Sequence, residues 1–117
     1  MKRFYLFFVA VLFFGLLFSS CDKLNMLGKI KYEVTCTPRG FDVTYTNRGG
    51  NTEQKDISGS RWSTSFTGDQ GAFVYVSAQA HNDNANITVK IYYGGKIIKQ
   101  AHSSGDYVIA TASGSLP

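Results

Sequence analysis

The sequence predicts an all-β fold: an antiparallel immunoglobulin- or transthyretin-like β-sandwich of seven to eight strands, preceded by a helical signal segment. Apolar and polar residues alternate with a period of two along most of the chain after residue 29. Clusters of Gly, Asn, Asp, Ser or Pro interrupt this alternation about every eight to twelve residues, and Val, Ile, Thr, Tyr and Phe dominate between them. An eight-stranded barrel is the alternative, but residues 30–117 are few for a barrel that encloses a ligand.

The alternating runs give the expected strands, which are, in chain order, 30–37, 41–46, 52–57, 62–66, 72–81, 87–93, 96–101 and 107–112. The first run alternates most cleanly and places one apolar set on a single face: Ile30, Tyr32, Val34 and Cys36. Pro38-Arg39-Gly40 turns the chain into the second run, and the polar stretch 47–51 turns it into the third.

The middle runs differ in polarity, which predicts their places in the sheets. Residues 52–57 are polar and weakly patterned, as in an edge strand with exposed charges. Residues 62–66 place Trp62, Thr64 and Phe66 on one side. Residues 72–81 carry apolar side chains on both faces and therefore predict a central strand.

The last runs surround the strongest turn signal of the chain. Gly94-Gly95 separates two strand patterns by two residues that can both take positive φ, which predicts a hairpin. The Asn/Asp-rich residues 82–86 predict a loop before this hairpin. Ser103-Ser104-Gly105 is expected to end the strand after it, and residues 114–117 are expected to form a tail.

The first residues predict export and lipidation. Met1-Lys2-Arg3 is basic, and residues 4–18 carry no charge, as in a secretory signal peptide. Phe18-Ser19-Ser20-Cys21 resembles a bacterial lipobox, in which the cysteine receives a diacylglyceryl group and becomes the acylated N-terminus. The expected organisation is a signal peptide (1–20), a lipidated tether (21–29) and a β-sandwich domain (30–117). A plain signal peptide with a chance cysteine and an uncleaved anchor are the alternatives.

The second cysteine, Cys36, has two readings. If Cys21 carries lipid, Cys36 has no partner and is expected to be a buried free thiol, because it shares the apolar face of its strand. A Cys21–Cys36 disulfide is the alternative that an exported protein permits. Neither cysteine lies in a CxxC or zinc-ligand pattern.

Charge and titratable residues give little indication of chemistry. The net charge of +4 falls to +2 once Lys2 and Arg3 are set aside, so no nucleic-acid partner is expected. His102-Ser103-Ser104-Gly105-Asp106 contains the residue types of a catalytic triad, but a turn explains it better. No two carboxylates stand out as a glycosidase pair among Glu33, Asp42, Asp56, Asp69, Asp83 and Asp106.

Three further features contain residue types found in binding sites. Residues 81–86 offer oxygen ligands for Ca²⁺, but they lack the regular spacing of a calcium loop and favour an Asn/Asp turn. Trp62 is expected in the core of the sandwich rather than on a sugar- or partner-binding surface. Tyr92, beside the Gly94-Gly95 turn, is expected to be the better exposed aromatic candidate.

Several short stretches occur in an order that resembles the soluble domain of the mycobacterial membrane protein small (MmpS) family. They are Tyr32-Glu33-Val34-Thr35, Asp42-Val43-Thr44-Tyr45-Thr46, Trp62-Ser63, Val76-Ser77-Ala78-Gln79, Ile87-Thr88-Val89-Lys90-Ile91 and Ser104-Gly105-Asp106-Tyr107. The resemblance implies a small sandwich held at a membrane as an accessory subunit of a large RND-type lipid transporter. The family's transmembrane helix is replaced here by the lipobox, and the family's cysteine pair by Val89 and Ala112.

Together these features predict a lipid-anchored, non-catalytic binding or accessory subunit of a bacterial envelope complex. The expected partners are the membrane, reached through the lipid on Cys21, and an envelope protein, with an RND-type transporter as one candidate. No catalytic residue, metal or cofactor other than the covalent lipid is expected. The domain is expected in the periplasm or at the cell surface. The alternative is a surface-exposed ligand- or glycan-binding module.

Overall fold

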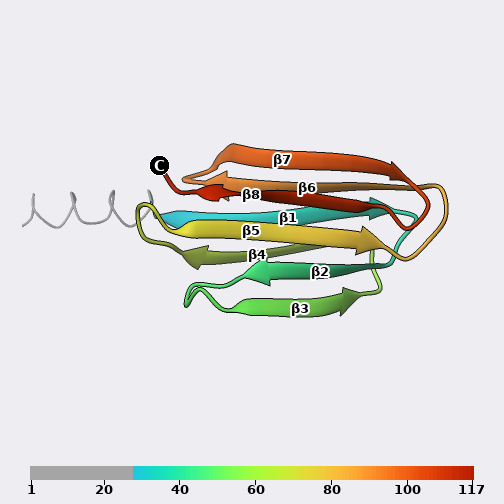
Figure 1. The fold of residues 1–117 in the computed structure, drawn as a ribbon, viewed down its shortest axis with the longest axis horizontal. Coiled ribbons are helices and arrows are strands. Elements are labelled where there is room, and N and C mark those ends of the chain that lie inside the picture. Colours follow the sequence, from blue (N-terminus) through green and yellow to red (C-terminus); the bar gives the residue numbers. More distant parts are fainter. Residues whose placement is uncertain (1–27) are drawn as a thin grey trace, which may run out of the picture.

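A computed structural model describes residues 28–117, which form eight antiparallel strands in two sheets (Figure 1). The strands are β1 (Lys29–Thr37), β2 (Phe41–Thr46), β3 (Thr52–Ile57), β4 (Arg61–Thr67), β5 (Phe73–Ala80), β6 (Ala85–Tyr93), β7 (Lys96–Gly105) and β8 (Ile109–Ser115). The predicted all-β sandwich is therefore confirmed. No helix within this part of the chain is long and apolar enough to cross a membrane.

Each sheet has four strands, in the orders β4-β1-β6-β7 and β3-β2-β5-β8. Only β2–β3 and β6–β7 are hairpins of neighbouring strands, so most connections cross from one sheet to the other. The chain therefore passes repeatedly over the ends of the sandwich, and the loops gather at these two ends (Figure 1).

The core lies between the sheets and is built by the period-two alternation of β1, β2, β5 and β6. Its largest fully buried side chains are Tyr32, Phe41, Ile30, Ile87, Ile91, Val34, Val43, Val74, Val76, Val89 and Cys36. Burying such side chains contributes about 1.5–3 kcal/mol each relative to exposing them. The alternation of the sequence thus supplies both inner faces of the sandwich.

One buried hydroxyl joins the two sheets. Tyr32 lies on β1, and its hydroxyl donates to the carbonyl oxygen of Thr46 on β2 at 2.9 Å, with Thr46 Oγ1 at 3.0 Å. The hydroxyl oxygen of Tyr32 also accepts a hydrogen bond from the backbone N–H of Tyr75 on β5 at 3.3 Å. Pairing between β2 and β5 stops at Tyr45 and Val76, so Tyr32 replaces the missing partner at that point.

We name the two ends of the sandwich by their distance from residue 28. The near end contains Gly28, and its carbonyl accepts a hydrogen bond from the N–H of Gly68 at 2.8 Å. The C-terminus and the 47–51, 68–72 and 94–95 turns lie at the same end (Figure 1). The far end carries the connections 38–40, 58–60, 81–84 and 106–108.

Several predicted boundaries are wrong. The strand expected at 96–101 does not stop before Ser103-Ser104-Gly105: these are the last three residues of β7, because the polar side chains of His102 and Ser104 face solvent and bond to β6. Residues 114–117 are not a free tail, since β8 reaches Ser115 and the next side chain, Leu116, is buried.

Other boundaries move less. The predicted 82–86 loop ends early, because Ala85 is buried and begins β6. Lys29, expected in the tether, is the first residue of β1. The predicted signal peptide, and the tether as far as residue 27, lie outside the described residues.

β5 is a central strand, as predicted, since it lies between β2 and β8. Its second apolar face is not covered, however. Phe73 is 60% exposed and stacks on Tyr75 with ring centroids 6.4 Å apart. The predicted edge strand 52–57 is confirmed as β3, whose residues are all exposed except the half-buried Ile57.

Candidate functional site

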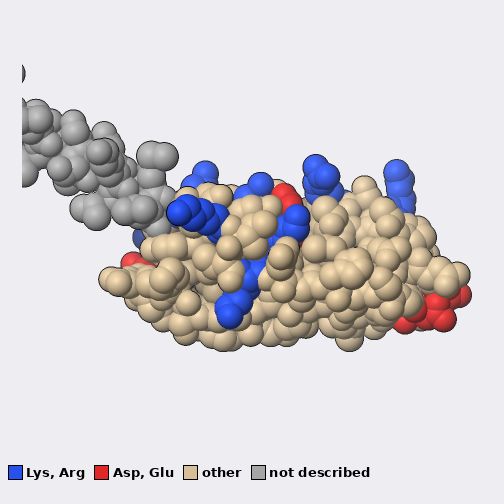
Figure 2. Space-filling model, turned by 90° about the horizontal axis from the view of Figure 1, so that it is seen from above, with Lys and Arg blue, Asp and Glu red and all other residues tan. Residues whose placement is uncertain are grey.

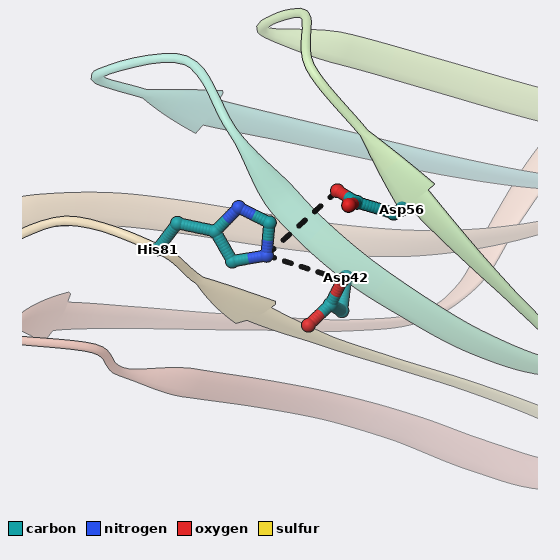
Figure 3. A group of neighbouring side chains, drawn as sticks. All are labelled: Asp42, Asp56 and His81. Carbon is teal, nitrogen blue, oxygen red and sulfur yellow. Dashed lines mark ion pairs between the residues drawn. The ribbon is translucent and has the colours of Figure 1, made fainter.

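Three side chains of metal-ligating type meet on the outer face of one sheet, toward the far end. Figure 3 shows His81 pointing at Asp42 and Asp56. Nε2 of His81 lies 3.1 Å from Oδ1 of Asp42 and 3.9 Å from Oδ1 of Asp56. One nitrogen and two carboxylate oxygens lie within 4.8 Å of one another. We call these residues the Asp-Asp-His cluster.

The β2–β3 hairpin brings the two carboxylates together. Its turn lies at residues 47–51, and the register pairs Asp42 directly with Asp56. Directly opposed residues of an antiparallel pair have Cβ atoms about 4.5–5.5 Å apart and point to the same face. The two aspartates therefore share the outer face, because their neighbours Phe41 and Val43 point into the core.

His81 is held in place by the backbone beyond β5. Its N–H donates to the carbonyl of Gly40 at 3.1 Å, which fixes the residue beside the start of β2. Gly40 has a φ of 108°, and a Cβ at that position would lie 3.4 Å from Nδ1 of His81. The next side chain, Asn82, donates to the carbonyl of Arg39 at 2.8 Å. Backbone pairing thus places the imidazole beside the aspartates.

The electrostatics of the cluster are unbalanced. Two like charges directly opposite each other destabilise a sheet. Among the described residues, His81 is the only basic side chain within ion-pair distance of Asp42 or Asp56. The three side chains are partly open to solvent: 37% exposed for His81, 40% for Asp42 and 80% for Asp56.

The sequence does not single out this cluster, although one signal was available. Asp42 and Asp56 are equally distant from Gly49, the middle residue of the 47–51 turn, so a regular hairpin about that residue pairs them. His81 could not be placed in this way, because its position depends on the pairing of β2 with β5.

The triad reading of residues 102–106 does not match the observed geometry. His102 lies within β7, where its Nδ1 is 2.9 Å from Thr88 Oγ1 and its Nε2 is 3.0 Å from Ser104 Oγ. Ser103 donates to the carbonyl of Ile109 at 2.7 Å. Asp106 instead accepts a hydrogen bond from the N–H of Asn84 at 2.9 Å. The aspartate therefore orders a neighbouring loop and does not orient the histidine.

The side chains of residues 81–86 likewise face different partners. His81 faces the aspartates of β2 and β3, Asn82 bonds to the 38–40 turn, and Asn84 takes a positive φ of 49°. Its N–H is used by Asp106. These side chains do not converge on one point, so the segment is held together by backbone bonds of the kind that Asx-rich turns form.

The two aromatic candidates have structural partners. Trp62 is half-buried and packs on the core, with its ring centroid 4.9 Å from that of Tyr45. Tyr92 is partly buried on the outer face of the other sheet, where its hydroxyl donates to Glu33 at 3.3 Å and Lys31 Nζ lies 5.5 Å from its ring. Burial and the neighbouring Glu33 carboxylate raise the pKa of Tyr92.

A small pocket of about 210 Å³ opens at the near end. Its lining residues are Ile30, Thr46, Asn47, Arg48, Gly50, Phe66, Thr67, Gly68, Asp69, Ala72, Phe73 and Val74. Ligand sites for drug-sized molecules usually enclose about 300–1,000 Å³. The pocket is therefore smaller than most such sites, and it lies where β2 and β4 end.

Cys36 is a buried free thiol, as the strand pattern predicts. Its Sγ lies 3.3 Å from the carbonyl oxygen of Pro38, and burial raises the pKa of the thiol. A raised pKa lowers the thiolate fraction, so the side chain is unreactive in the folded protein. The predicted lipidation site, Cys21, lies outside the described residues.

Figure 2 shows one face of the sandwich with Lys and Arg side chains spread along it. The largest group of Asp or Glu side chains in this view lies at the far end, and others lie near the middle of the sandwich and at the near end. Asp83 and Asp106 belong to the exposed loops of the far end.

No protein-family model matches the chain, and no curated protein matches it significantly.

Proposed function

We propose that the protein is a membrane-anchored bacterial lipoprotein, held in the cell envelope by acyl chains on Cys21. The sandwich acts as a non-catalytic binding or accessory subunit of an envelope complex. The lipobox-like run that ends at Cys21 supports the anchor. Several acyl chains give stable attachment, whereas one chain binds only marginally.

The position of residue 28 is the observation that carries the proposal. The chain enters the sandwich at the near end, and only residues 21–27 separate this end from the proposed anchor. Seven residues span at most about 25 Å when fully extended. The near end would therefore stay close to the lipid surface, and the far end would be directed away from it, toward partners in the envelope.

The far end has a surface suited to a protein partner. Tyr107 and Ile109 are 55% and 54% exposed, although both are large and apolar. Tyr107 has a positive φ of 51°, a conformation that is uncommon for bulky residues and often found at functional sites. Its backbone is held by Asn82 and Gln79, so its side chain is presented in a fixed place.

The distribution of ionisable groups favours binding over catalysis. Across residues 28–117 no Asp, Glu, His, Lys or Arg side chain is buried. Catalytic acids and bases usually depend on burial to shift their pKa values toward the working pH. An interaction surface needs no such shift. The resemblance to the MmpS family makes an RND-type transporter the first partner to test.

The anchor and the partner can be tested separately. Mass spectrometry of the protein from membranes should show a chain that begins at an acylated Cys21, and Cys21→Ala should abolish both modification and membrane attachment. A chain that still begins at an unmodified Met1 would refute the anchor.

For the partner, photo-crosslinking residues placed at Tyr107 and at Ile97 compare the two ends. We expect a protein adduct from position 107 and lipid adducts from position 97, which lies near the start of β7 at the near end. Equal protein adducts from both positions would contradict the orientation. A carbohydrate-array signal without any protein adduct would favour the glycan-binding alternative.

A further inference from the structure

We propose that the Asp-Asp-His cluster is a binding site for a divalent transition-metal ion of the Zn²⁺ class. This inference does not depend on the lipid anchor or on the protein partner. Imidazole nitrogen suits first-row transition metals such as zinc, and carboxylate oxygens complete many of their sites. Asp42, Asp56 and His81 supply one nitrogen and two oxygens from three neighbouring strands or strand ends.

The distances between the donor atoms fit one small ion. With metal–ligand bonds of about 2.0–2.2 Å, two ligands of a tetrahedral ion lie about 3.3–3.6 Å apart. Nε2 of His81 is 3.1 Å from Asp42 and 3.9 Å from Asp56, values on either side of this range. Both separations would reach it through small side-chain rotations.

The freedom needed for that adjustment lies in one residue. Asp42 is on an inner strand of its sheet, and His81 is fixed by its backbone bond to Gly40. Asp56 is on the edge strand β3 and is 80% exposed, so its carboxylate can rotate without disturbing the core. Two donors are therefore positioned before binding, and the third can close on the ion.

The charge pattern gives the site a driving force. Asp42 and Asp56 repel each other across the ladder, and no Lys or Arg of the described chain pairs with them. A divalent cation bound between the two carboxylates would offset both charges. Bound metal would also connect β3 to β2 and to the residue that follows β5.

Isothermal titration of the full chain in detergent with Zn²⁺, and separately with Mg²⁺, tests the proposal. Histidine coordinates metal through its neutral imidazole, so the titrations are run at about pH 8. We expect saturable binding of Zn²⁺ and much weaker binding of Mg²⁺. His81→Gln should weaken Zn²⁺ binding at least about tenfold, the loss that removing even an outer-shell partner can cause.

Matched controls separate the cluster from other donors. His102→Gln removes a histidine of the opposite sheet, and Asp69→Asn removes a carboxylate at the near end. Neither should change Zn²⁺ affinity. Because every variant has the same residues before Gly28, metal bound there cancels in the comparison. Co²⁺ absorption provides a second readout of coordination that does not depend on heat.

Asp56→Asn distinguishes a metal site from an ion pair that only stabilises the fold. With a chelator present, Asp56→Asn should be as stable as the wild type or more stable, because the repulsion is removed. With Zn²⁺ present, the melting temperature of the wild type should rise and that of Asp56→Asn should not. The proposal fails if no saturable binding occurs up to about 1 mM Zn²⁺. It also fails if His81→Gln and Asp56→Asn bind as tightly as the wild type.

Discussion

The hydroxyl of Tyr32 is the polar contact that joins the two sheets inside the core, and Tyr32→Phe removes it without changing the shape of the side chain. The substitution leaves the carbonyl of Thr46 and the N–H of Tyr75 without this partner. A buried group that loses its hydrogen bond costs about 1–3 kcal/mol. Two groups lose a partner, but the bond to Tyr75 is long, at 3.3 Å, and only part-buried. We therefore expect the free energy of unfolding to fall by about 2 kcal/mol, the lower limit for two such groups.

Urea denaturation of the purified protein measures this loss. For a domain of this size an m-value of about 1 kcal/mol/M converts 2 kcal/mol into a midpoint lower by about 2 M. Tyr92→Phe is the matched control, because it removes a hydroxyl on the outer face of the other sheet that makes one long bond to Glu33, and it should cost less than about 0.5 kcal/mol. A loss below about 0.5 kcal/mol for Tyr32→Phe, with an unchanged m-value, would refute the argument.

The same hydroxyl predicts the behaviour of the protein in alkali. Burial raises the pKa of Tyr32, while its bonds to Thr46 and Tyr75 lower it by less. The folded state therefore keeps a proton that the unfolded state releases above about pH 10. This contribution to stability is fully present below pH 10 and is lost as the pH rises from there through the folded pKa. In urea titrations the difference in the free energy of unfolding between the wild type and Tyr32→Phe should accordingly become smaller above about pH 10.

Three other predictions concern single residues. Gly68→Ala should lower stability by about 1–3 kcal/mol, because the new methyl group collides with Ile30. Gly59→Ala is the control and should change stability little, because the space around Gly59 is open. Equal shifts of the urea midpoint for the two variants would contradict this prediction. Tyr107→Asn should raise stability by up to about 1 kcal/mol, because Asn tolerates positive φ, and a lower urea midpoint than the wild type would contradict this. Cys36 should react with thiol reagents only as fast as the protein opens, and rapid modification of the folded protein would show that the thiol is not buried.

The order and extent of most strands follow from the sequence because period-two alternation reports directly which side chains are buried. The run from Ile30 to Cys36 is buried at every second position, as its pattern predicts. Gly94 and Gly95 both have positive φ, 59° and 83°, as the hairpin between them requires. These features depend on neighbouring residues alone, so no knowledge of the partner strands was needed.

The wrong strand boundaries occur where polar residues belong to strands. His102 and Ser104 look like turn residues, but they occupy the solvent face of β7 and bond to Thr88 and to Asn86. Leu116 follows Gly114 and Ser115, a run typical of a tail, but its backbone bonds to Ala72 and Gly71 and its side chain is buried in the core. A local pattern does not reveal such cross-strand partners.

The Asp-Asp-His cluster shows the same limit more clearly. One half of it follows from hairpin symmetry, which pairs Asp42 with Asp56 about the 47–51 turn. The other half depends on the non-local pairing of β2 with β5, which brings His81 alongside after a separation of 39 residues from Asp42. Register within a hairpin can be calculated from a sequence, whereas the order of strands in a sheet is decided by the packing of the whole core.

The polar character of β3 affects how copies of the protein behave beside one another. An edge strand offers unpaired backbone groups that a second chain can extend into a shared sheet. Lipid anchoring, as proposed, would concentrate the domain in two dimensions and make such encounters frequent. Glu53, Lys55 and Asp56 place charges of both signs along that edge, and all three are exposed. A neighbouring β3 would have to desolvate these charges to pair, so the least buried strand of the sandwich would protect a domain crowded by the proposed anchor from aggregating edge to edge.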